Sequence, residues 1–428
     1  MYVRRVVLKD VRAFEKADLD LAPTEVYPGW AVVTGDNGSG KTALLRAISL
    51  GLLGPDQTRD LVPDLRGWTR AGGESAEISV EVLPNHEYDR TSAGGYPAKS
   101  TFWAEVGVEQ QHGRWALSSI DIFRKKRKGA ANGPWNSTPG WLAVAYGPFR
   151  RLYGSSPDAQ RLMVLPGRTP NFGTLFREDA TLSEAEEWIK NLHYRRLEGK
   201  NEEKRTLESA LRLLNNDFLK YGVTVEDVTS EGVWLKDAAG QKIRLSDMSE
   251  GFRSALAMLI DIFRHMVIAY GPDIVRSDDE EQHCYVDRPG FVMIDEIDAH
   301  LHPDWQREIG FWLKSHFPKV QFLVTTHSPL VCQAADEGRI YHLPAPGTDQ
   351  PFRLSDPDFD AVVAGRADEI LLTPAFGLRN TRSPRAVRAL KRHADLKAKQ
   401  RSSTLSASEQ EEIGQLSMFA ELAAESVE

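Results

Sequence analysis

The stretch Gly35-Asp36-Asn37-Gly38-Ser39-Gly40-Lys41-Thr42 decides how this 428-residue chain folds. It has the spacing G-x-x-x-x-G-K-[ST], in which a glycine-rich backbone turns its N–H groups inward around phosphate oxygens. An apolar run (30–34) precedes it and a helical pattern from Lys41 follows, as that mechanism requires. Lys41 would reach the β- and γ-phosphates, Thr42 would hold Mg²⁺, and the helix would add the positive end of its dipole. We therefore predict a nucleotide site in a strand–loop–helix unit.

Composition limits the remaining possibilities. The chain carries a net charge of −8 and only two cysteines, which excludes a disulfide framework and suits a reducing compartment. No apolar run approaches the roughly 18 to 20 residues of a membrane span, and the N-terminus lacks a signal-peptide stretch. We expect a cytoplasmic protein with no membrane partner.

A second acidic segment completes the predicted site. The apolar run 291–294 ends in Asp295 and Glu296, which supplies one carboxylate for Mg²⁺ and a second that polarises water. The alternative is a strand that merely ends in a charged turn, and the perfect phosphate loop upstream argues against it. His327 follows the next predicted strand, so it would point at the same edge of a parallel sheet.

Two histidines in this region suggest a metal site. His300 and His302 alternate beside Asp298, but no third histidine or cysteine lies in supporting register. We do not expect zinc there.

Taken together, these segments resemble the ABC-type ATPases of the SMC, RecF and OLD kind. The Walker A motif is 35–42, the Walker B motif 291–296, the D-loop 298–303, the switch histidine His327, and the signature loop Leu245–Arg253, a variant of L-S-G-G-Q. In this family the signature loop closes over the ATP of a second protomer. The resemblance therefore implies ATP and Mg²⁺ as ligands, a homodimer or higher homo-oligomer, and a glutamate that resets the dimer.

The resemblance also assigns the site residues. Nucleotide contacts fall to Asn37, Gly38, Ser39, Gly40, Lys41, Thr42, Ser249, Glu250, Gly251 and Asp298; metal binding falls to Thr42 and Asp295; catalysis falls to Glu296 and His327. One position departs from the family pattern, because Tyr146-Gly147-Pro148-Phe149-Arg150-Arg151 stands where the Q-loop glutamine is usual. Contact of the two arginines with phosphate, contact with a partner, and a plain surface turn stay open.

We expect an α/β fold: an ABC-ATPase head of the P-loop NTPase class, with a mixed sheet and flanking helices, an antiparallel β-subdomain, a short helical lobe and a helical C-terminal tail. Residues 1–160 would form the N-terminal part of the head, 161–222 the helical lobe, 223–345 the C-terminal part of the head, and 346–428 the tail.

Three functional classes compete within this family. A membrane-transporter motor is disfavoured, because 203 residues separate Thr42 from Leu245 where about a hundred are usual, and the signature lacks Gly-Gly-Gln. A RecF- or SMC-like ATPase of DNA repair or recombination is the alternative, although the helical insert is too short for SMC arms. The favoured class is the ATPase subunit of a bacterial antiphage system, resembling Septu-type or retron-associated ATPases.

The effector of such a system would be a separate nuclease or toxin. The acidic cluster Asp356–Asp360 is interpreted as a turn, so a nuclease centre within this chain is disfavoured. The tail offers docking sites, since nine Lys or Arg residues lie between Arg379 and Arg401, while 402–428 holds six acids and no Lys or Arg. Docking of the effector by the acidic segment, nucleic-acid contact by the basic one or by Arg124–Lys128, and plain solvated helices all stay open.

Overall fold

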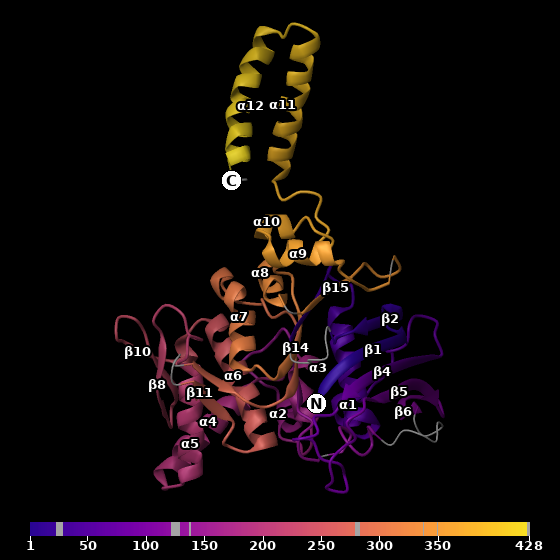
Figure 1. Cartoon of the computed structure of the whole chain (residues 1–428), viewed down its shortest axis with the longest axis vertical. Helices are drawn as coiled ribbons and strands as arrows, with labels where there is room; N and C mark the ends of the chain where they lie inside the picture. Colours follow the sequence, from indigo (N-terminus) through magenta and orange to yellow (C-terminus); the bar gives the residue numbers. More distant parts are fainter. Residues whose placement is uncertain are drawn as a thin grey trace. The chain divides into compact units, whose positions relative to one another are not determined.

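A computed structural model describes residues 1–22, 29–120, 129–136, 138–278, 283–336, 338–348 and 350–425, with their side chains up to Ser417. Residues Met1–Phe376 form one compact unit and Gly377–Glu428 form a second (Figure 1). The first unit therefore continues past the boundary that we expected after residue 345. The basic run Arg124–Lys128 lies outside the described residues.

The first unit is built on a six-stranded sheet in the order β16-β15-β3-β14-β13-β7. Its strands are β3 (Gly29–Gly35), β7 (Ala143–Tyr146), β13 (Gly290–Ile294), β14 (Val320–Thr325), β15 (Arg339–Leu343) and β16 (Phe352–Arg353). All neighbouring strands are parallel except β15 and β16. The carboxyl ends of β3, β14, β13 and β7 consequently share one edge, where ligands of such sheets gather.

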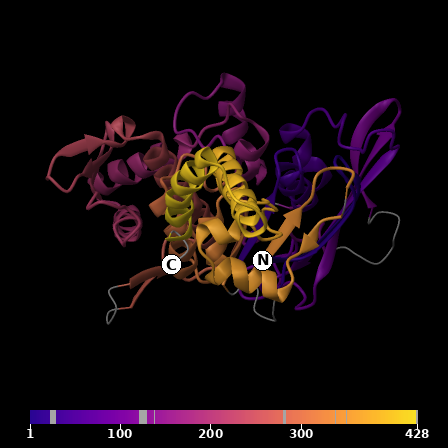
Figure 2. The same cartoon turned by 90° about the horizontal axis from the view of Figure 1, so that it is seen from above.

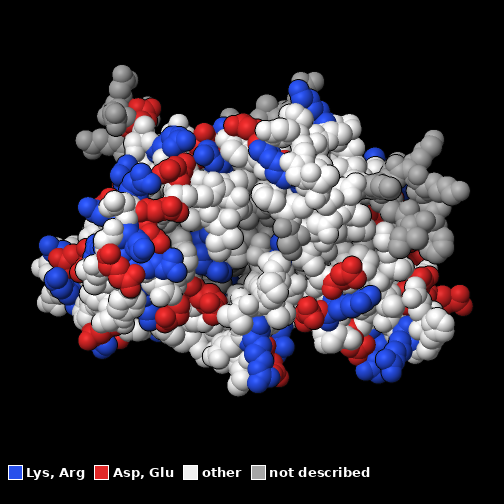
Figure 3. Space-filling view, turned by 90° about the horizontal axis from the view of Figure 1, so that it is seen from below, with Lys and Arg blue, Asp and Glu red and all other residues white. Residues whose placement is uncertain are grey.

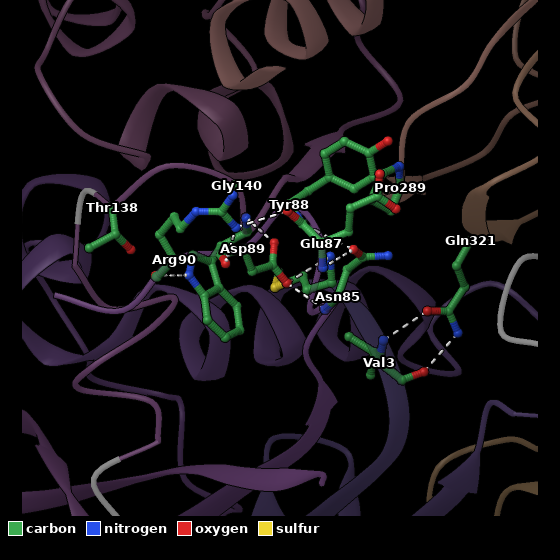
Figure 4. A network of polar contacts seen from close by, with 12 residues as sticks. Val3, Asn85, Glu87, Tyr88, Asp89, Arg90, Thr138, Gly140, Pro289 and Gln321 are labelled. Atoms are coloured by element: carbon green, nitrogen blue, oxygen red, sulfur yellow. Dashed lines mark hydrogen bonds and ion pairs between the residues drawn. The ribbon is translucent and has the colours of Figure 1, made fainter. Parts of the chain in front are cut away.

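An antiparallel sheet packs beside this one, in the order β2-β1-β4-β5-β6. Its strands are β1 (Tyr2–Val11), β2 (Phe14–Asp20), β4 (Ser75–Leu83), β5 (Phe102–Gln111) and β6 (Arg114–Ser119). Buried residues alternate with exposed or partly exposed ones along β4, as expected for a sheet that covers the core with one face. The side chain of Gln321 in β14 joins the two sheets: its Oε1 accepts from the backbone N–H of Val3 at 2.8 Å and its amide donates back to the carbonyl at 2.7 Å (Figure 4).

Two apolar cores lie on the two faces of the central sheet. Along β14, Phe322 and Val324 belong to one core and Leu323 to the other, because side chains alternate in direction along a strand. The antiparallel sheet and α1 (Lys41–Leu61) cover one face, and α6 (Glu250–Tyr270) and α7 (Pro303–His316) cover the other. Figures 1 and 2 show these layers, with the helical lobe of α4 (Ser183–Leu197) and α5 (Asn201–Leu214) beyond α6.

The remaining elements of this unit are short. They are α2 (Pro157–Met163), η2 (Thr169–Phe172), α3 (Gly173–Phe176), β8 (Thr224–Thr229), β9 (Gly232–Lys236), β10 (Lys242–Arg244), η3 (Leu245–Asp247), β11 (Val275–Asp278), β12 (His283–Val286), α8 (Pro329–Cys332), η4 (Gln333–Ala335), α9 (Asp356–Ala364) and α10 (Ala367–Ile370). The expected α/β head, with its antiparallel subdomain and helical lobe, is confirmed. No helix of the described chain is both long and apolar enough to cross a bilayer.

The acidic cluster Asp356–Asp360 is the start of α9, and our interpretation of it as a turn is wrong. The Ser355 side chain accepts a hydrogen bond from the N–H of Asp358, which caps the helix. Acids in a first helical turn also interact favourably with the helix dipole. The capped start of α9 therefore accounts for the acids of this cluster by their position in a first helical turn.

A buried carboxylate, Asp89, ties the loop after β4 to the segment that enters β7. Its Oδ2 accepts from the N–H of Asn85 at 2.7 Å and its Oδ1 accepts from the N–H of Trp141 at 2.6 Å, while the Met1 amino group lies 3.3 Å from Oδ2 (Figure 4). Asp89 is fully buried, so these partners replace the water that a carboxylate otherwise needs.

The second unit is a helical hairpin of α11 (Pro384–Ser402) and α12 (Ala407–Glu425). The side chain of Ser383 caps the start of α11. Arg392 and Glu412 form a two-pronged ion pair with N–O distances of 2.9 and 2.8 Å, and Lys399 lies 2.7 Å from Glu409. The basic and acidic segments of the tail are thus partners of each other.

Candidate functional site

The predicted phosphate loop joins β3 to α1, and its glycines adopt backbone conformations that side chains rarely reach. Gly38 has a φ of 82° and Gly40 a φ of 100°. A Cβ on Gly40 would lie 2.8 Å from the ring of Phe14, so the turn between β1 and β2 presses against the loop. Asn37 and Gly38 are exposed at the tip, whereas Ser39 is buried.

Lys41 begins α1 and is only 6% exposed. Its ammonium group donates to the carbonyl of Gly35 at 2.7 Å and to that of Asp36 at 3.0 Å, so it lies over the loop. Burial lowers the pKa of this lysine, opposed chiefly by the charge of Asp295. A partly desolvated cation at a loop of inward N–H groups is suited to bind phosphate oxygens.

The predicted metal ligands meet beside Lys41. The Thr42 hydroxyl donates to Asp295 Oδ2 at 2.6 Å, although 253 residues separate the two in the sequence. The other carboxylate oxygen, Oδ1, accepts from the hydroxyl of Thr325 at 2.6 Å. Asp295 is fully buried, and its orientation is therefore set by hydroxyls from both neighbouring elements.

Glu296 follows in a left-handed conformation, with a φ of 46°. Its N–H donates to the Thr325 hydroxyl at 2.7 Å, so one threonine fixes both acids of the Walker B motif. Because φ > 0 is unfavourable for a residue with a side chain, surrounding contacts must hold this turn in place. The Glu296 side chain is partly exposed at the sheet edge.

The D-loop and the switch histidine are joined by one carboxylate. Asp298 Oδ1 accepts from the Thr326 hydroxyl at 2.5 Å and from the N–H of His327 at 3.3 Å. His327 itself is exposed. The structure therefore brings these two predicted residues together at the end of β14.

The signature loop leads into α6. Ser249 is the N-cap residue by position, yet its side chain makes no capping hydrogen bond, and both Ser249 and Glu250 are exposed. A Cβ on Gly251 would lie 2.2 Å from the carbonyl oxygen of His300, so the helix start packs directly on the D-loop of the same chain. The arrangement presents a hydroxyl and a helix N-terminus to solvent, which suits an anion supplied from outside.

The two arginines at the Q-loop position have different surroundings. Arg150 is 4% exposed and donates to the backbone carbonyls of residues that follow β13. Arg151 is exposed, with its guanidinium 5.6 Å from the ring centre of Phe149.

His302 has a structural role. Its Nδ1 accepts from the N–H of Asp304 and caps α7, and Tyr221 lies beside it. No group of three or more metal-binding side chains occurs within the ranges that the structure describes.

A cavity of about 230 Å³ opens beside the phosphate loop. It is lined by the β1–β2 turn, by the loop that follows β15, and by other residues, among them Phe14, Ser39, Arg70 and Gln350. The Ser39 hydroxyl is buried and has no hydrogen-bond partner among the described residues. A polar atom left in this position indicates that the loop is shaped for a further ligand.

Sequence reasoning missed Thr325 and Thr326 as site residues. They are adjacent, and each holds a different predicted acid: Thr325 holds Asp295 and Thr326 holds Asp298. A signal was present, because two threonines end an apolar strand at the ligand edge of a parallel sheet.

Family models and known proteins match parts of this chain. A family model described as "AAA domain, putative AbiEii toxin, Type IV TA system" matches residues 161–333, and one described as "AAA domain" matches residues 5–134. Among solved structures, the Smc head domain with an extended coiled coil bound to the C-terminal domain of ScpA, derived from Pyrococcus furiosus, is 16% identical with a TM-score of 0.47 and covers 85% of this chain and 98% of that chain.

This chain matches only part of the length of each of several known relatives. Septu protein PtuA of Bacillus mycoides (strain KBAB4) is 26% identical over 76% of this chain and 38% of that protein. The probable ATPase of retron Ec83 from Escherichia coli is 37% identical over 26% of this chain and 18% of that protein. The DNA replication and repair protein RecF of Stenotrophomonas maltophilia (strain R551-3) is 41% identical over 22% of this chain and 24% of that protein. This chain thus spans less than half of each of these relatives.

Proposed function

We propose that this chain is an AAA-domain ATPase of the ABC type, which binds ATP with Mg²⁺ and hydrolyses it at the edge formed by β3, β13 and β14. One observation carries this proposal: Thr42 and Asp295 are in direct contact beside Lys41. A threonine hydroxyl and a carboxylate next to a phosphate-binding lysine are the oxygen ligands that Mg²⁺ prefers.

The surroundings fit a nucleotide in further ways. Among the described residues the Ser39 hydroxyl has no hydrogen-bond partner, and it would bind a phosphate oxygen or the ribose. The cavity beside the loop would accept the base, between Phe14 on one side and residues near Gln350 on the other. Lys41 would exchange its two carbonyl partners for the β- and γ-phosphates.

Hydrolysis would depend on Glu296. Its carboxylate lies one residue beyond the metal ligand and would polarise the attacking water. Mg²⁺, when bound, would neutralise charge developing on the phosphates. The exposed His327, held by Asp298, would contact the terminal phosphate from the end of β14.

We further propose that the site is shared between two protomers. The exposed Ser249, whose side chain makes no capping hydrogen bond at the start of α6, would bind the terminal phosphate of ATP on a second copy. Because Gly251 packs on the D-loop, a movement of the signature loop when the dimer closes would also move Asp298 at the hydrolytic edge. ATP would then be the ligand that holds the dimer together.

The biological role that we propose is the ATPase subunit of a bacterial antiphage system, which would regulate a separate nuclease or toxin. The match to Septu protein PtuA over 76% of this chain supports it. The RecF match supports the alternative, an ATPase of DNA repair, over a shorter segment. Expression together with the neighbouring genes tests the choice: loss of phage plaques that depends on Lys41 supports defence, and sensitivity to DNA damage after gene deletion supports repair.

Partners would bind through the helical hairpin. Since Glu409 and Glu412 are already paired with α11, the acidic helix is less available for docking than the sequence suggested. Exposed cations of α11, such as Arg388 and Lys391, would contact nucleic acid. On the face of the first unit in Figure 3, basic and acidic side chains are intermixed, which makes that face a poorer candidate.

Phosphate release from Mg-ATP by the purified full chain tests the enzymatic proposal. Lys41→Ala should lose nucleotide binding and turnover, whereas Glu296→Gln should bind ATP and lose about 100-fold or more in turnover. Lys9→Ala is the matched control, because Lys9 is an exposed lysine of β1. Full turnover in Glu296→Gln would show that Glu296 does not polarise the attacking water.

A further inference from the structure

Arg150 is a buried cation, and within the described residues the hydrogen bonds of its guanidinium go to backbone carbonyls. Its Nη1 donates to the carbonyls of Gly147 at 3.0 Å and Asp295 at 2.6 Å. Its Nη2 donates to the carbonyls of Glu296 at 3.1 Å and Ile297 at 3.5 Å. The planar guanidinium therefore spans the backbone of three consecutive residues, which a lysine ammonium cannot do in the same way.

Those three residues form the turn that needs support. The chain leaves β13 at Ile294 and reverses at Glu296, whose left-handed φ of 46° is unfavourable for a side-chain residue. Thr325 holds the N–H of Glu296, and Arg150 holds its carbonyl. Both ends of this residue are thus fixed, which sets the direction in which its carboxylate projects.

The charge of Arg150 suits this place. Burial lowers the pKa of its guanidinium to about 10, against the opposing influence of Asp295, Asp298 and Glu296. The group consequently remains protonated at neutral pH. It offsets the repulsion among three carboxylates gathered around one turn.

The loop that carries Arg150 is itself held firmly. The carbonyl of Tyr146 accepts from the N–H of Asp295 at 2.8 Å, and the Tyr146 hydroxyl donates to Asp261 of α6 at 2.9 Å. A Cβ on Gly147 would lie 2.2 Å from the carbonyl oxygen of Thr174, so this loop packs tightly against α3. These contacts hold the backbone of the loop that carries Arg150 between the sheet edge and the signature helix α6.

We propose that Arg150 is the positioning residue of the hydrolytic carboxylate, acting through the backbone of residues 295–297. The inference rests on the proposed ATP hydrolysis by Glu296 and adds to it a residue that acts through the backbone carbonyls of 295–297. It also gives the segment at the Q-loop position a role that differs from that of the usual glutamine. Arg150 couples the loop after β7 to the turn that directs the base.

The test compares Arg150→Ala and Arg150→Lys in the full chain, with Arg151→Ala as the exposed neighbouring control. Both Arg150 variants should lose turnover, Arg150→Ala by about 30- to 100-fold, as for outer partners of a reactive group. Their dissociation constants for ATP should stay within about threefold of wild type, because phosphate contacts are intact. Added guanidinium should restore at least about tenfold of the turnover of Arg150→Ala, since it can re-form hydrogen bonds to the same carbonyls.

Other outcomes separate the alternatives. Wild-type turnover in Arg150→Ala would overturn the proposal, and so would loss of ATP binding together with turnover and no response to guanidinium. If Arg150→Ala fails to fold, Arg150→Lys decides by the same comparison of turnover with ATP affinity. Glu296→Gln is measured in parallel: its full turnover would overturn the role of the base itself, whereas an inactive Glu296→Gln beside a fully active Arg150→Ala would overturn only the inference about Arg150.

Discussion

Replacing Thr325 by valine removes one hydroxyl and leaves the shape of the side chain nearly unchanged. In the native chain that hydroxyl donates to Asp295 at 2.6 Å and accepts from the N–H of Glu296 at 2.7 Å. Valine can make neither bond, so a buried carboxylate oxygen and a largely buried N–H lose their partner together. Both lie in the predicted hydrolytic centre.

The expected cost follows from these two bonds. A hydrogen bond to a charged group contributes about 1.5–3 kcal/mol, and an unpaired buried donor costs about 1–3 kcal/mol. Because both effects act at one residue they do not simply add, and we expect a loss of about 3 kcal/mol. For a unit of residues Met1–Phe376, an unfolding entropy of about 2.1 cal/mol/K per residue converts this into a Tm lower by about 4 °C.

Turnover should respond more strongly than stability. Loss of the partner that orients a metal ligand typically costs about 10- to 100-fold in activity or metal affinity, so Thr325→Val should need more Mg²⁺ and turn over more slowly. Thermal unfolding and a magnesium titration of phosphate release measure the two effects. Thr325→Ser is the control, since it keeps the hydroxyl. A valine variant with the Tm, turnover and magnesium dependence of wild type would refute the reasoning.

Two further predictions concern the signature helix. Burial would raise the pKa of the Asp261 carboxyl, but His265 and Arg264 outweigh it and hold that pKa well below its usual range. The stabilisation of the fold by the ionised Asp261 is therefore fully present above about pH 4, the ordinary pKa of the group, and is lost as the pH falls further. Below about pH 4 the Tm of wild type should fall more steeply than the Tm of Asp261→Asn. In Gly251→Ala the new Cβ would lie 2.2 Å from the His300 carbonyl oxygen, so the start of α6 or the D-loop must shift. Phosphate release should fall about tenfold or more. Unchanged phosphate release would show that this contact does not matter for turnover.

Much of the site follows from short-range patterns in the sequence. The phosphate loop is recognisable because its glycines and its lysine occupy fixed offsets between a strand and a helix. The contact between Thr42 and Asp295 also follows, since parallel strands bring their carboxyl ends to one edge. These features depend on local geometry and on the topology of the sheet.

Other features depend on contacts that no local pattern encodes. For Arg150 the sequence leaves open contact with phosphate, contact with a partner and a surface turn, because nothing in its segment indicates that the side chain turns inward to the backbone that follows β13. The extent of the first unit to Phe376 was likewise not predictable, since it depends on the packing of α9 and α10 after the last predicted motif. The charge blocks of the tail were visible, but their mutual pairing requires the hairpin.

The central claim is that ATP holds two copies of this chain together through the signature loop. Sedimentation velocity of Glu296→Gln with saturating ATP and Mg²⁺ tests it most directly, because this variant should bind ATP without hydrolysing it. We predict a dimer that forms only with ATP and is lost when Ser249→Arg is added to the same chain. A particle with the mass of one chain at saturating ATP, or a dimer indifferent to both ATP and Ser249→Arg, would contradict the account.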